Sequence, residues 1–201
     1  MKLILVRRGA VDVPSTQILG QTDTPLAVQG FTDIQRLATS WDAPPPRFVF
    51  SSDLKRARQS AQIFAAHFAQ EPLIDPRLRE ITYGQWDGHT WQDTMRDDPE
   101  AYHVWSQHWV IQPAPKGESV ADLMHRSGSW LSSLLASTDA NDTVLAISHQ
   151  GSIRALLCHV LGLAPKHSLA LRIDPAGATC IACHEGRFEV CYSNVSRFQS
   201  E

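Results

Sequence analysis

The sequence predicts an α/β fold, a three-layer sandwich in which helices cover both faces of a mostly parallel central sheet. Three short apolar runs, at 2–7, 47–51 and 143–148, have the length and composition of buried strands. Segments with helical spacing separate these runs, and strands that alternate with helices favour parallel pairing. The hydrophobic content of 43% supports a sizeable core. We therefore expect one domain over 1–201, with an inserted subregion at about 82–117.

Proline and serine residues mark the element boundaries in the first half. The loop expected at 12–26 is followed by a helix at about 27–41, which the three prolines at 44–46 end. After the second strand, apolar residues recur at helical spacing from Leu54 to about residue 70. Ser51-Ser52-Asp53 precedes this helical segment and offers polar side chains for its N-cap.

The second half begins with a less regular, tryptophan-rich segment, which we interpret as an insertion over a site. A helix is predicted at about 119–137, and another from Ile153 to Leu161, where Gly162 ends it. Turn-forming residues separate the strands near the C-terminus, and we expect the last of these strands to pair antiparallel. These strands are predicted at 168–174, 178–184 and 187–193.

Net charge and the N-terminal segment restrict the location and the partners. A formal charge of −3 and a pI near 6.3 give no bulk attraction to nucleic acid or to an anionic membrane. An anion site therefore needs a local cluster of arginine and histidine. The apolar run 3–6 ends at two arginines, too early for a signal-peptide core, and no run approaches the roughly 20 residues that span a bilayer. We expect a cytoplasmic protein whose four cysteines are reduced thiols.

One cysteine pattern suggests a different function. Cys180-Ile181-Ala182-Cys183-His184 matches the Cys-x-x-Cys-His pattern of covalent haem attachment, and Cys191 could add a ligand to a zinc site. The pattern lies in a predicted strand, where side chains alternate, so Cys180 and Cys183 point to opposite faces. No export signal accompanies it. We therefore expect neither a metal nor a cofactor.

Four polar motifs follow one another at the ends of predicted strands. They are Leu5-Val6-Arg7-Arg8-Gly9, Ser51-Ser52-Asp53-Leu54-Lys55-Arg56-Ala57, Leu78-Arg79-Glu80 with the turn Gly84-Gln85-Trp86-Asp87-Gly88, and Ser148-His149-Gln150-Gly151. In this order and at this spacing they resemble the motifs of the histidine phosphatase superfamily, the phosphoglycerate mutase-like proteins. The resemblance covers most of the chain and implies that the sandwich is of the phosphoglycerate mutase-like type.

The resemblance also implies a role for each motif. Glu80 is expected to be the general acid that protonates the leaving group. A phosphoryl group in transfer spreads negative charge over its oxygens, and convergent arginines can each donate two hydrogen bonds to it. A single arginine at a strand end is more often a surface ion pair, so these roles depend on the four motifs together. The expected phosphate-binding residues are Arg7, Gly9, Arg56 and His149.

Arg8 stands where the superfamily has the histidine that takes the phosphoryl group. Neutral imidazole has a lone pair near pH 7, whereas a guanidinium group stays protonated and has none. We therefore predict greatly reduced or no turnover, from a substitution that is either natural or introduced. Whether the chain is an enzyme stays open. The alternatives are an inactive protein that binds a phosphorylated ligand and a phosphoglycerate mutase-like phosphotransferase.

In its modest length the chain resembles members of the phosphatase branch of the superfamily. Hydrolysis of a phosphomonoester is therefore the leading reaction. Residues 97–102, with Trp105 and Trp109, and the tail at 172–174 resemble the α-ribazole phosphatases of cobalamin biosynthesis. A lid formed by Trp86, Trp105 and Trp109 would suit the flat base of α-ribazole 5'-phosphate, although tryptophans also fill cores. The expected partner is a phosphorylated small molecule or inorganic phosphate. A homodimer is also considered, but no nucleic acid or membrane.

Overall fold

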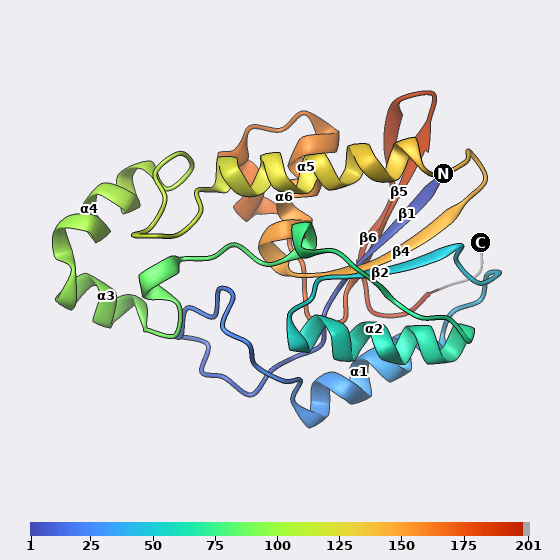
Figure 1. Ribbon diagram of the computed structural model, residues 1–201, viewed down its shortest axis with the longest axis horizontal. Coiled ribbons are helices and arrows are strands. Elements are labelled where there is room, and N and C mark those ends of the chain that lie inside the picture. Colours follow the sequence, from blue (N-terminus) through green and yellow to red (C-terminus); the bar gives the residue numbers. More distant parts are fainter. Residues whose placement is uncertain (199–201) are drawn as a thin grey trace.

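A six-stranded mixed sheet forms the centre of the computed structural model, which describes residues 1–198 (Figure 1). The strand order is β3-β2-β4-β1-β5-β6. The first four strands in this order pair parallel, and β5 and β6 pair antiparallel, as the sequence predicts. The strands are β1 (Lys2–Arg7), β2 (Phe48–Ser51), β3 (Leu73–Ile74), β4 (Thr143–Ser148), β5 (Ala178–His184) and β6 (Arg187–Val195).

Two pairs of helices cover opposite faces of the sheet, which confirms the three-layer prediction (Figure 1). Alternation along β1 creates the two cores, because neighbouring side chains of a strand point to opposite faces. Ile4 and Val6 pack with the first pair of helices, and Leu3 and Leu5 with the second. The first pair is α1 (Val28–Thr39) and α2 (Lys55–Phe68), and the second is α5 (Val120–Ala136) and α6 (Gln150–Leu161).

The helix ends agree with the sequence in part. Ser119 caps α5 through a capping box with Asp122, and Gly162 ends α6 in the left-handed conformation. The expected side-chain cap of α2 is wrong, because the N-cap residue is Leu54 and the Ser52 hydroxyl only accepts a hydrogen bond from its amide. Helix α6 starts earlier than predicted, directly after β4, with His149 as its N-cap.

The strand predicted at 168–174 is absent, and a 3₁₀ turn at Pro165–Ala170 begins this region instead. Two carbonyls of this segment bond to side chains and not to a neighbouring strand. Arg154 donates to Leu171 O, and Arg7 donates to Ile173 O. The two-residue strand β3 was missed because a periodic pattern cannot be recognised over so short a length.

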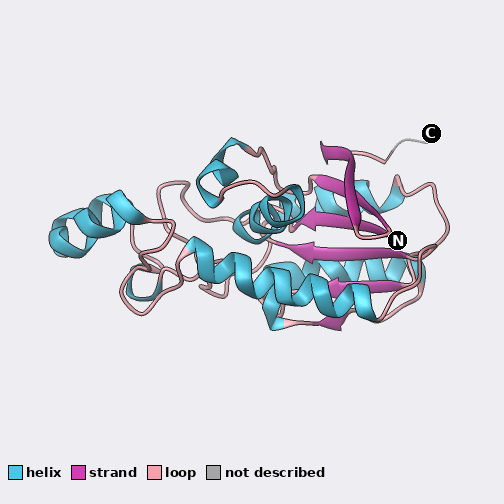
Figure 2. Ribbon diagram, turned by 90° about the horizontal axis from the view of Figure 1, so that it is seen from above, coloured by secondary structure: helices cyan, strands magenta, loops and turns pink. Residues whose placement is uncertain are grey.

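The tryptophan-rich segment forms two short helices, α3 (Trp91–Asp97) and α4 (Pro99–His108), which project beyond the end of the sheet (Figure 2). A small aromatic core of its own lies beneath them, with Trp86 buried at its centre. Turns connect this segment to the sheet, a 3₁₀ turn at Pro76–Leu78 among them. Within residues 1–198, no helix has the length and apolar character needed to cross a membrane.

Candidate functional site

The residues of the four motifs meet at one cavity of about 710 Å³, at the carboxyl ends of the central strands. Arg7 and Ser148 are partners in the β1–β4 register, so both strands end at the same place. The carboxyl edge of a parallel sheet is where ligands usually bind in α/β folds. Charged side chains line one part of the cavity, and these are Arg7, Arg8, Arg56, Glu80 and Arg154.

Arg56 reaches this cavity from the first turn of α2 and is fully buried. Its two terminal nitrogens donate to the carbonyls of Thr22 and Gly20, at 2.6 and 2.7 Å. These bonds fix the loop that follows β1 and leave Nε without a partner in the described structure. Burial lowers the pKa of Arg56. The guanidinium group therefore both organises the loop and keeps its Nε–H unused.

Gly9 makes a close backbone contact. A Cβ atom at this position would lie 2.4 Å from the carbonyl oxygen of Gly30, so any larger residue would push the segment that follows β1 away from α1. Its amide donates to Ser60 Oγ at 3.1 Å, and Ser60 in turn donates to the carbonyl of Arg56. The Gly9 amide is thus already used inside the protein, which differs from the phosphate contact expected from the motif.

Arg7 and Arg8 both line the cavity at the end of β1. Arg7 donates to Ile173 O at 2.6 Å, and Arg8 donates to Gly9 O at 2.8 Å. The Nε atoms of both are buried without a partner in the described structure. Burial, followed by the charges of Arg7 and Arg56, lowers the pKa of Arg8 to about 9. Arg8 is therefore a cation at neutral pH, held in a site that disfavours its charge.

His149 is buried at the junction of β4 and α6, with 1% of its surface exposed. Its Nε2 lies 2.9 Å from the hydroxyl of Ser52, and its Nδ1 is buried without a partner in the described residues. Burial, and then the charges of Arg56 and Arg8, lower the pKa of His149 well below its usual value. The imidazole is thus neutral near pH 7 and can present one N–H group.

Four buried nitrogen atoms have no hydrogen-bond partner in residues 1–198. Three are the Nε atoms of Arg7, Arg8 and Arg56, which line the cavity. The fourth is Nδ1 of His149, which is not among the lining residues but feels the charges of the same arginines. A buried donor that stays unpaired costs free energy, and native structures rarely retain such groups without a reason. These four come from three different segments of the chain. An anion with several acceptor oxygens would satisfy them together.

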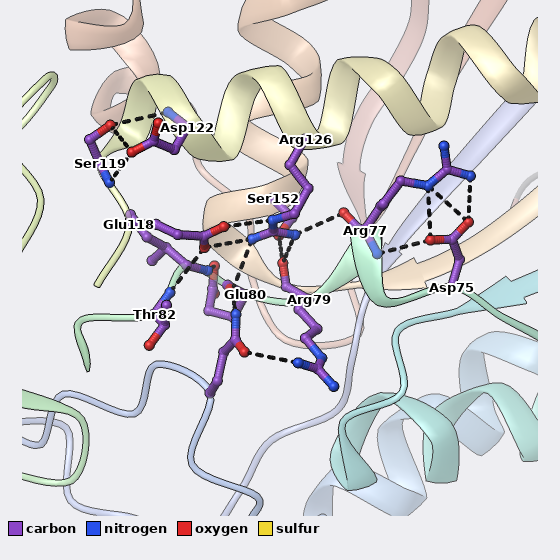
Figure 3. Close-up of polar contacts among 12 residues, drawn as sticks. Asp75, Arg77, Arg79, Glu80, Thr82, Glu118, Ser119, Asp122, Arg126 and Ser152 are labelled. Atoms are coloured by element: carbon purple, nitrogen blue, oxygen red, sulfur yellow. Dashed lines mark hydrogen bonds and ion pairs between the residues drawn. The ribbon is translucent and has the colours of Figure 1, made fainter. Parts of the chain in front are cut away.

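Glu80 is the one carboxylate among the described residues that line the cavity. Its Oε1 accepts a hydrogen bond from Ile81 N at 3.0 Å, and its Oε2 from Gly151 N at 3.2 Å in the first turn of α6 (Figure 3 shows Glu80 and its surroundings). A Cβ atom at Gly151 would lie 2.3 Å from Glu80 Oε1. Glycine is thus required there by the close approach of the carboxylate.

Several lining residues were not identified from the sequence. Arg154 follows Gln150 by one helical turn, so both face the cavity from α6. Helical spacing counted from Gln150 or Gly151 is the signal that could have identified Arg154. Tyr83 also lines the cavity, where burial and then the charge of Glu80 raise its pKa. No sequence pattern distinguishes Tyr83 from its neighbours.

Two of the three tryptophans expected in the lid line the cavity, and the third does not. Trp105 and Trp109 line the cavity, and so does Trp91, which was not predicted. We call Trp91, Trp105 and Trp109 the aromatic wall. Trp86 is not among the lining residues, because it is buried beneath the wall with its ring centroid 5.6 Å from that of Trp105. Trp91 and Trp105 stack at 4.9 Å, so each supports the other.

The cysteines of the haem-like pattern lie on opposite sides of the sheet. Cys180 belongs to the core beneath α1 and α2, and Cys183 packs against the core beneath α5 and α6. This agrees with the alternation expected of a strand. Within residues 1–198, no group of three or more histidine, cysteine, aspartate or glutamate side chains is arranged to hold a metal ion.

Known proteins resemble the chain over nearly its whole length. The family model described as histidine phosphatase superfamily (branch 1) matches residues 3–196. Adenosylcobalamin/alpha-ribazole phosphatase of Salmonella typhimurium is 27% identical over 187 residues, 92% of each chain. Phosphoserine phosphatase 1 of Hydrogenobacter thermophilus is 27% identical over 197 residues, 98% of this chain and 93% of that protein. A protein of Yersinia enterocolitica named "Probable phosphoglycerate mutase" is 30% identical over 178 residues, 86% of this chain and 80% of its own.

Solved structures show the same architecture. The alpha-ribazole phosphatase from Shigella flexneri superimposes with a TM-score of 0.92 over 100% of both chains, at 24% identity. The mycobacterial glucosyl-3-phosphoglycerate phosphatase in complex with inorganic phosphate has a TM-score of 0.83 and 29% identity, over 96% of this chain and 97% of that one. The first likeness shows a shared fold, and the second adds a relative that holds phosphate.

Proposed function

Because this chain belongs to branch 1 of the histidine phosphatase superfamily, we propose that its cavity binds a phosphomonoester and is built for phosphomonoester hydrolysis. The four unpaired nitrogen atoms of Arg7, Arg8, Arg56 and His149 carry this proposal. Phosphate oxygens are strong acceptors, and several converging donors match the charge that a phosphoryl group spreads in transfer. A solved relative that holds inorganic phosphate supports the same ligand class.

Each polar residue then has a distinct role. Arg7 and Arg56 bind the phosphoryl oxygens, and neutral His149 donates from Nδ1, since the Ser52 hydroxyl contacts its other nitrogen. Glu80 delivers a proton to the oxygen of the departing alcohol, because no other carboxylate lines the cavity in the described residues. Gly9 lets the segment directly after Arg7 and Arg8 pass close to α1.

Arg8 separates binding from turnover in this proposal. In the superfamily's chemistry, a histidine at this position attacks phosphorus with a nitrogen lone pair, and a guanidinium group has no such pair. Arg8 instead adds a third positive charge beside Arg7 and Arg56. The chain is therefore proposed to hold phosphorylated ligands with little or no hydrolysis. Its machinery otherwise matches that of a phosphatase.

We propose α-ribazole 5'-phosphate as a candidate ligand, because the aromatic wall offers flat apolar surface next to the phosphate clamp. Relatives named alpha-ribazole phosphatase support this choice. Phosphoryl transfer of the phosphoglycerate mutase type is the second candidate, supported by the relative at 30% identity. It needs the same nucleophile and so meets the same obstacle at Arg8.

A cytoplasmic location and a homodimer complete the proposal. Cell fractionation tests the location. No described contact in this single chain bears on the dimer. Sedimentation at several protein concentrations tests it, since a monomer at every concentration would contradict the dimer.

The deciding experiment compares Arg8 with Arg8→His and Arg8→Gln, on p-nitrophenyl phosphate and on α-ribazole 5'-phosphate. At about pH 8 the side chain at position 8 is neutral in both variants, but only histidine supplies a nucleophile. We expect Arg8→His to exceed the other two proteins by about 10³-fold or more in kcat, with an acid-labile phosphohistidine. A folded Arg8→His protein without activity on any phosphomonoester would refute the phosphatase proposal. Strong turnover by the unmodified chain would refute the proposed inactivity.

A further inference from the structure

The segment that carries Glu80 has little secondary structure of its own. Residues 79–83 lie between two short 3₁₀ turns and pair with no strand. Their backbone groups therefore need partners elsewhere, since a half-buried carbonyl without one is costly. The position of the Glu80 carboxylate depends on whatever holds this backbone.

Arg126 of α5 supplies these partners (Figure 3). One terminal nitrogen donates to Arg77 O at 2.9 Å and to Arg79 O at 3.0 Å. The other terminal nitrogen donates to Glu80 O at 3.3 Å. A single guanidinium group thus holds three carbonyls at and just before Glu80. Lysine, with one nitrogen, cannot span the same acceptors.

Glu118 fixes the orientation of that guanidinium group. Its two carboxylate oxygens accept from Nε and from a terminal nitrogen of Arg126, both at 2.7 Å. One of these oxygens also accepts from Thr82 N at 3.3 Å, on the other side of Glu80. About 20% of each side chain is exposed, so solvent competes little with this pair. Bidentate pairs of this kind restrict direction as well as distance.

Helix α6 holds the same segment from the opposite side. Ser152 donates to Arg79 O in a short hydrogen bond, and Gly151 N donates to the Glu80 carboxylate. Gln21 reaches Glu80 O from the loop after β1, at 2.9 Å. The Glu80 carbonyl is thus held by Arg126 of α5 together with Gln21, and the Glu80 carboxylate by Ile81 N together with Gly151 N of α6. A shift of the backbone would break the contact with α6.

We propose that Arg126, oriented by Glu118, is a positioning residue that fixes the Glu80 carboxylate at the amino end of α6 and so keeps it directed into the cavity. The role in catalysis rests on the proposed function of Glu80 as the acid. Arg126 touches neither the cavity nor the proposed phosphate ligand among the described contacts. Its effect passes through the Glu80 segment.

Amide hydrogen exchange tests the positioning directly in the unmodified chain, whatever its activity. Ile81 N and Gly151 N donate to the Glu80 carboxylate, so their exchange reports its position. We expect Arg126→Lys to speed both amides by at least about 10-fold while amides of the β1–β4 ladder keep their rates. Arg77→Lys is the matched control, because Arg77 pairs with Asp75 and its side chain does not contact Glu80. Unchanged exchange at both amides in Arg126→Lys overturns the proposal.

A kinetic cycle in the Arg8→His background tests the consequence. Arg126→Lys keeps the positive charge that influences His149. The substitution therefore tests the hydrogen-bond geometry of Arg126 separately from its charge. We expect kcat to fall about 10–100-fold with KM and phosphate affinity changed less than about 3-fold. When Glu80→Gln is already present, Arg126→Lys should have no further effect. Equal losses in both backgrounds would mean that Arg126 does not act through Glu80. If Arg8→His itself is inactive, the proposed function fails, and the exchange result still decides the positioning.

Discussion

Charge is unevenly distributed among the side chains of the cavity, where four arginines face one glutamate. A phosphomonoester dianion would offset much of this excess. The pKa of Arg8, lowered to about 9 by burial and by Arg7 and Arg56, means that its charge destabilises the empty fold at neutral pH. Such a shift corresponds to a cost on the order of a few kcal/mol. Anion binding thus offsets the cost of the Arg8 charge, whereas a neutral histidine at this position would carry no such cost.

His149 predicts how stability depends on pH. Its folded pKa lies well below the usual value, so the unfolded chain binds the proton first as pH falls through about 6.5. The free energy of unfolding contributed by this group is therefore lost on acidification. We expect His149→Gln to show a smaller loss of stability between about pH 7.5 and pH 5, measured by urea unfolding in phosphate-free buffer. The exposed His108→Gln is the control, and an unchanged pH dependence in His149→Gln would contradict the assignment.

Among the elements, the start of α6 is the most constrained by the site. Gly151 faces the Glu80 carboxylate, and a Cβ atom there would be 2.3 Å from Oε1. We expect Gly151→Ala to displace Glu80 and lower the stability by about 1–3 kcal/mol, the usual range for overpacking, despite alanine's better helix propensity. In the Arg8→His background, kcat should fall about 10-fold or more.

Gly128→Ala is the matched control for that substitution. It lies within α5, where the added Cβ meets the ring of His159 at 3.1 Å and leaves Glu80 untouched. Urea unfolding and steady-state kinetics of both variants separate the local clash from the general effect of removing a helical glycine. The close-approach explanation would be wrong if Gly151→Ala kept both its stability and its kcat.

The segment with α3 and α4 is expected to act on the organic part of a ligand and not on its phosphate. Trp105 lines the cavity and stacks on Trp91 at 4.9 Å. Its removal therefore takes away one ring of the aromatic wall and the stacking partner of another. We expect Trp105→Ala to weaken α-ribazole 5'-phosphate about 10-fold and inorganic phosphate hardly at all, by calorimetry on the unmodified Arg8 chain. Met95→Ala, at an exposed position of α3, is the control. Equal losses for both ligands would argue for a damaged fold in place of a lost contact.

For the molecule as a whole, the sequence predicted what depends on local patterns. Apolar runs located β1 and β4, and their alternation determined which side chains face each core. The strand predicted at 168–174 is wrong, because Arg154 and Arg7 donate to carbonyls of this segment and so compete with strand pairing. A pattern in one segment contains no information about such competition.

The candidate site was predictable to a similar extent. The motif residues Arg7, Arg56, Glu80 and His149 do converge, since parallel strands bring their carboxyl ends together. The sequence could not show which of their hydrogen-bond donors bond to the protein itself and which stay unpaired. Arg56 spends two nitrogens on loop carbonyls, and this depends on how the chain returns on itself after β1. Arg126 was likewise hidden, because its three acceptors belong to a segment without periodicity.

The site joins β1, α2, the Glu80 segment and α6, which lie far apart in the sequence, so a ligand held there should stabilise the whole fold. At about 100 times its Kd, phosphate adds about 2.7 kcal/mol, which should raise Tm by about 5–10 °C in a chain of this length. At about pH 8 and at one common phosphate concentration, the shift should be larger with Arg8 than with Arg8→His, because phosphate removes the cost of the third buried cation. Sodium chloride at equal ionic strength controls for screening, which weakens exposed charge pairs far more than a buried site. Differential scanning calorimetry of the two proteins decides the matter, since an equal or greater shift in Arg8→His would mean that Arg8 does not share in holding the anion.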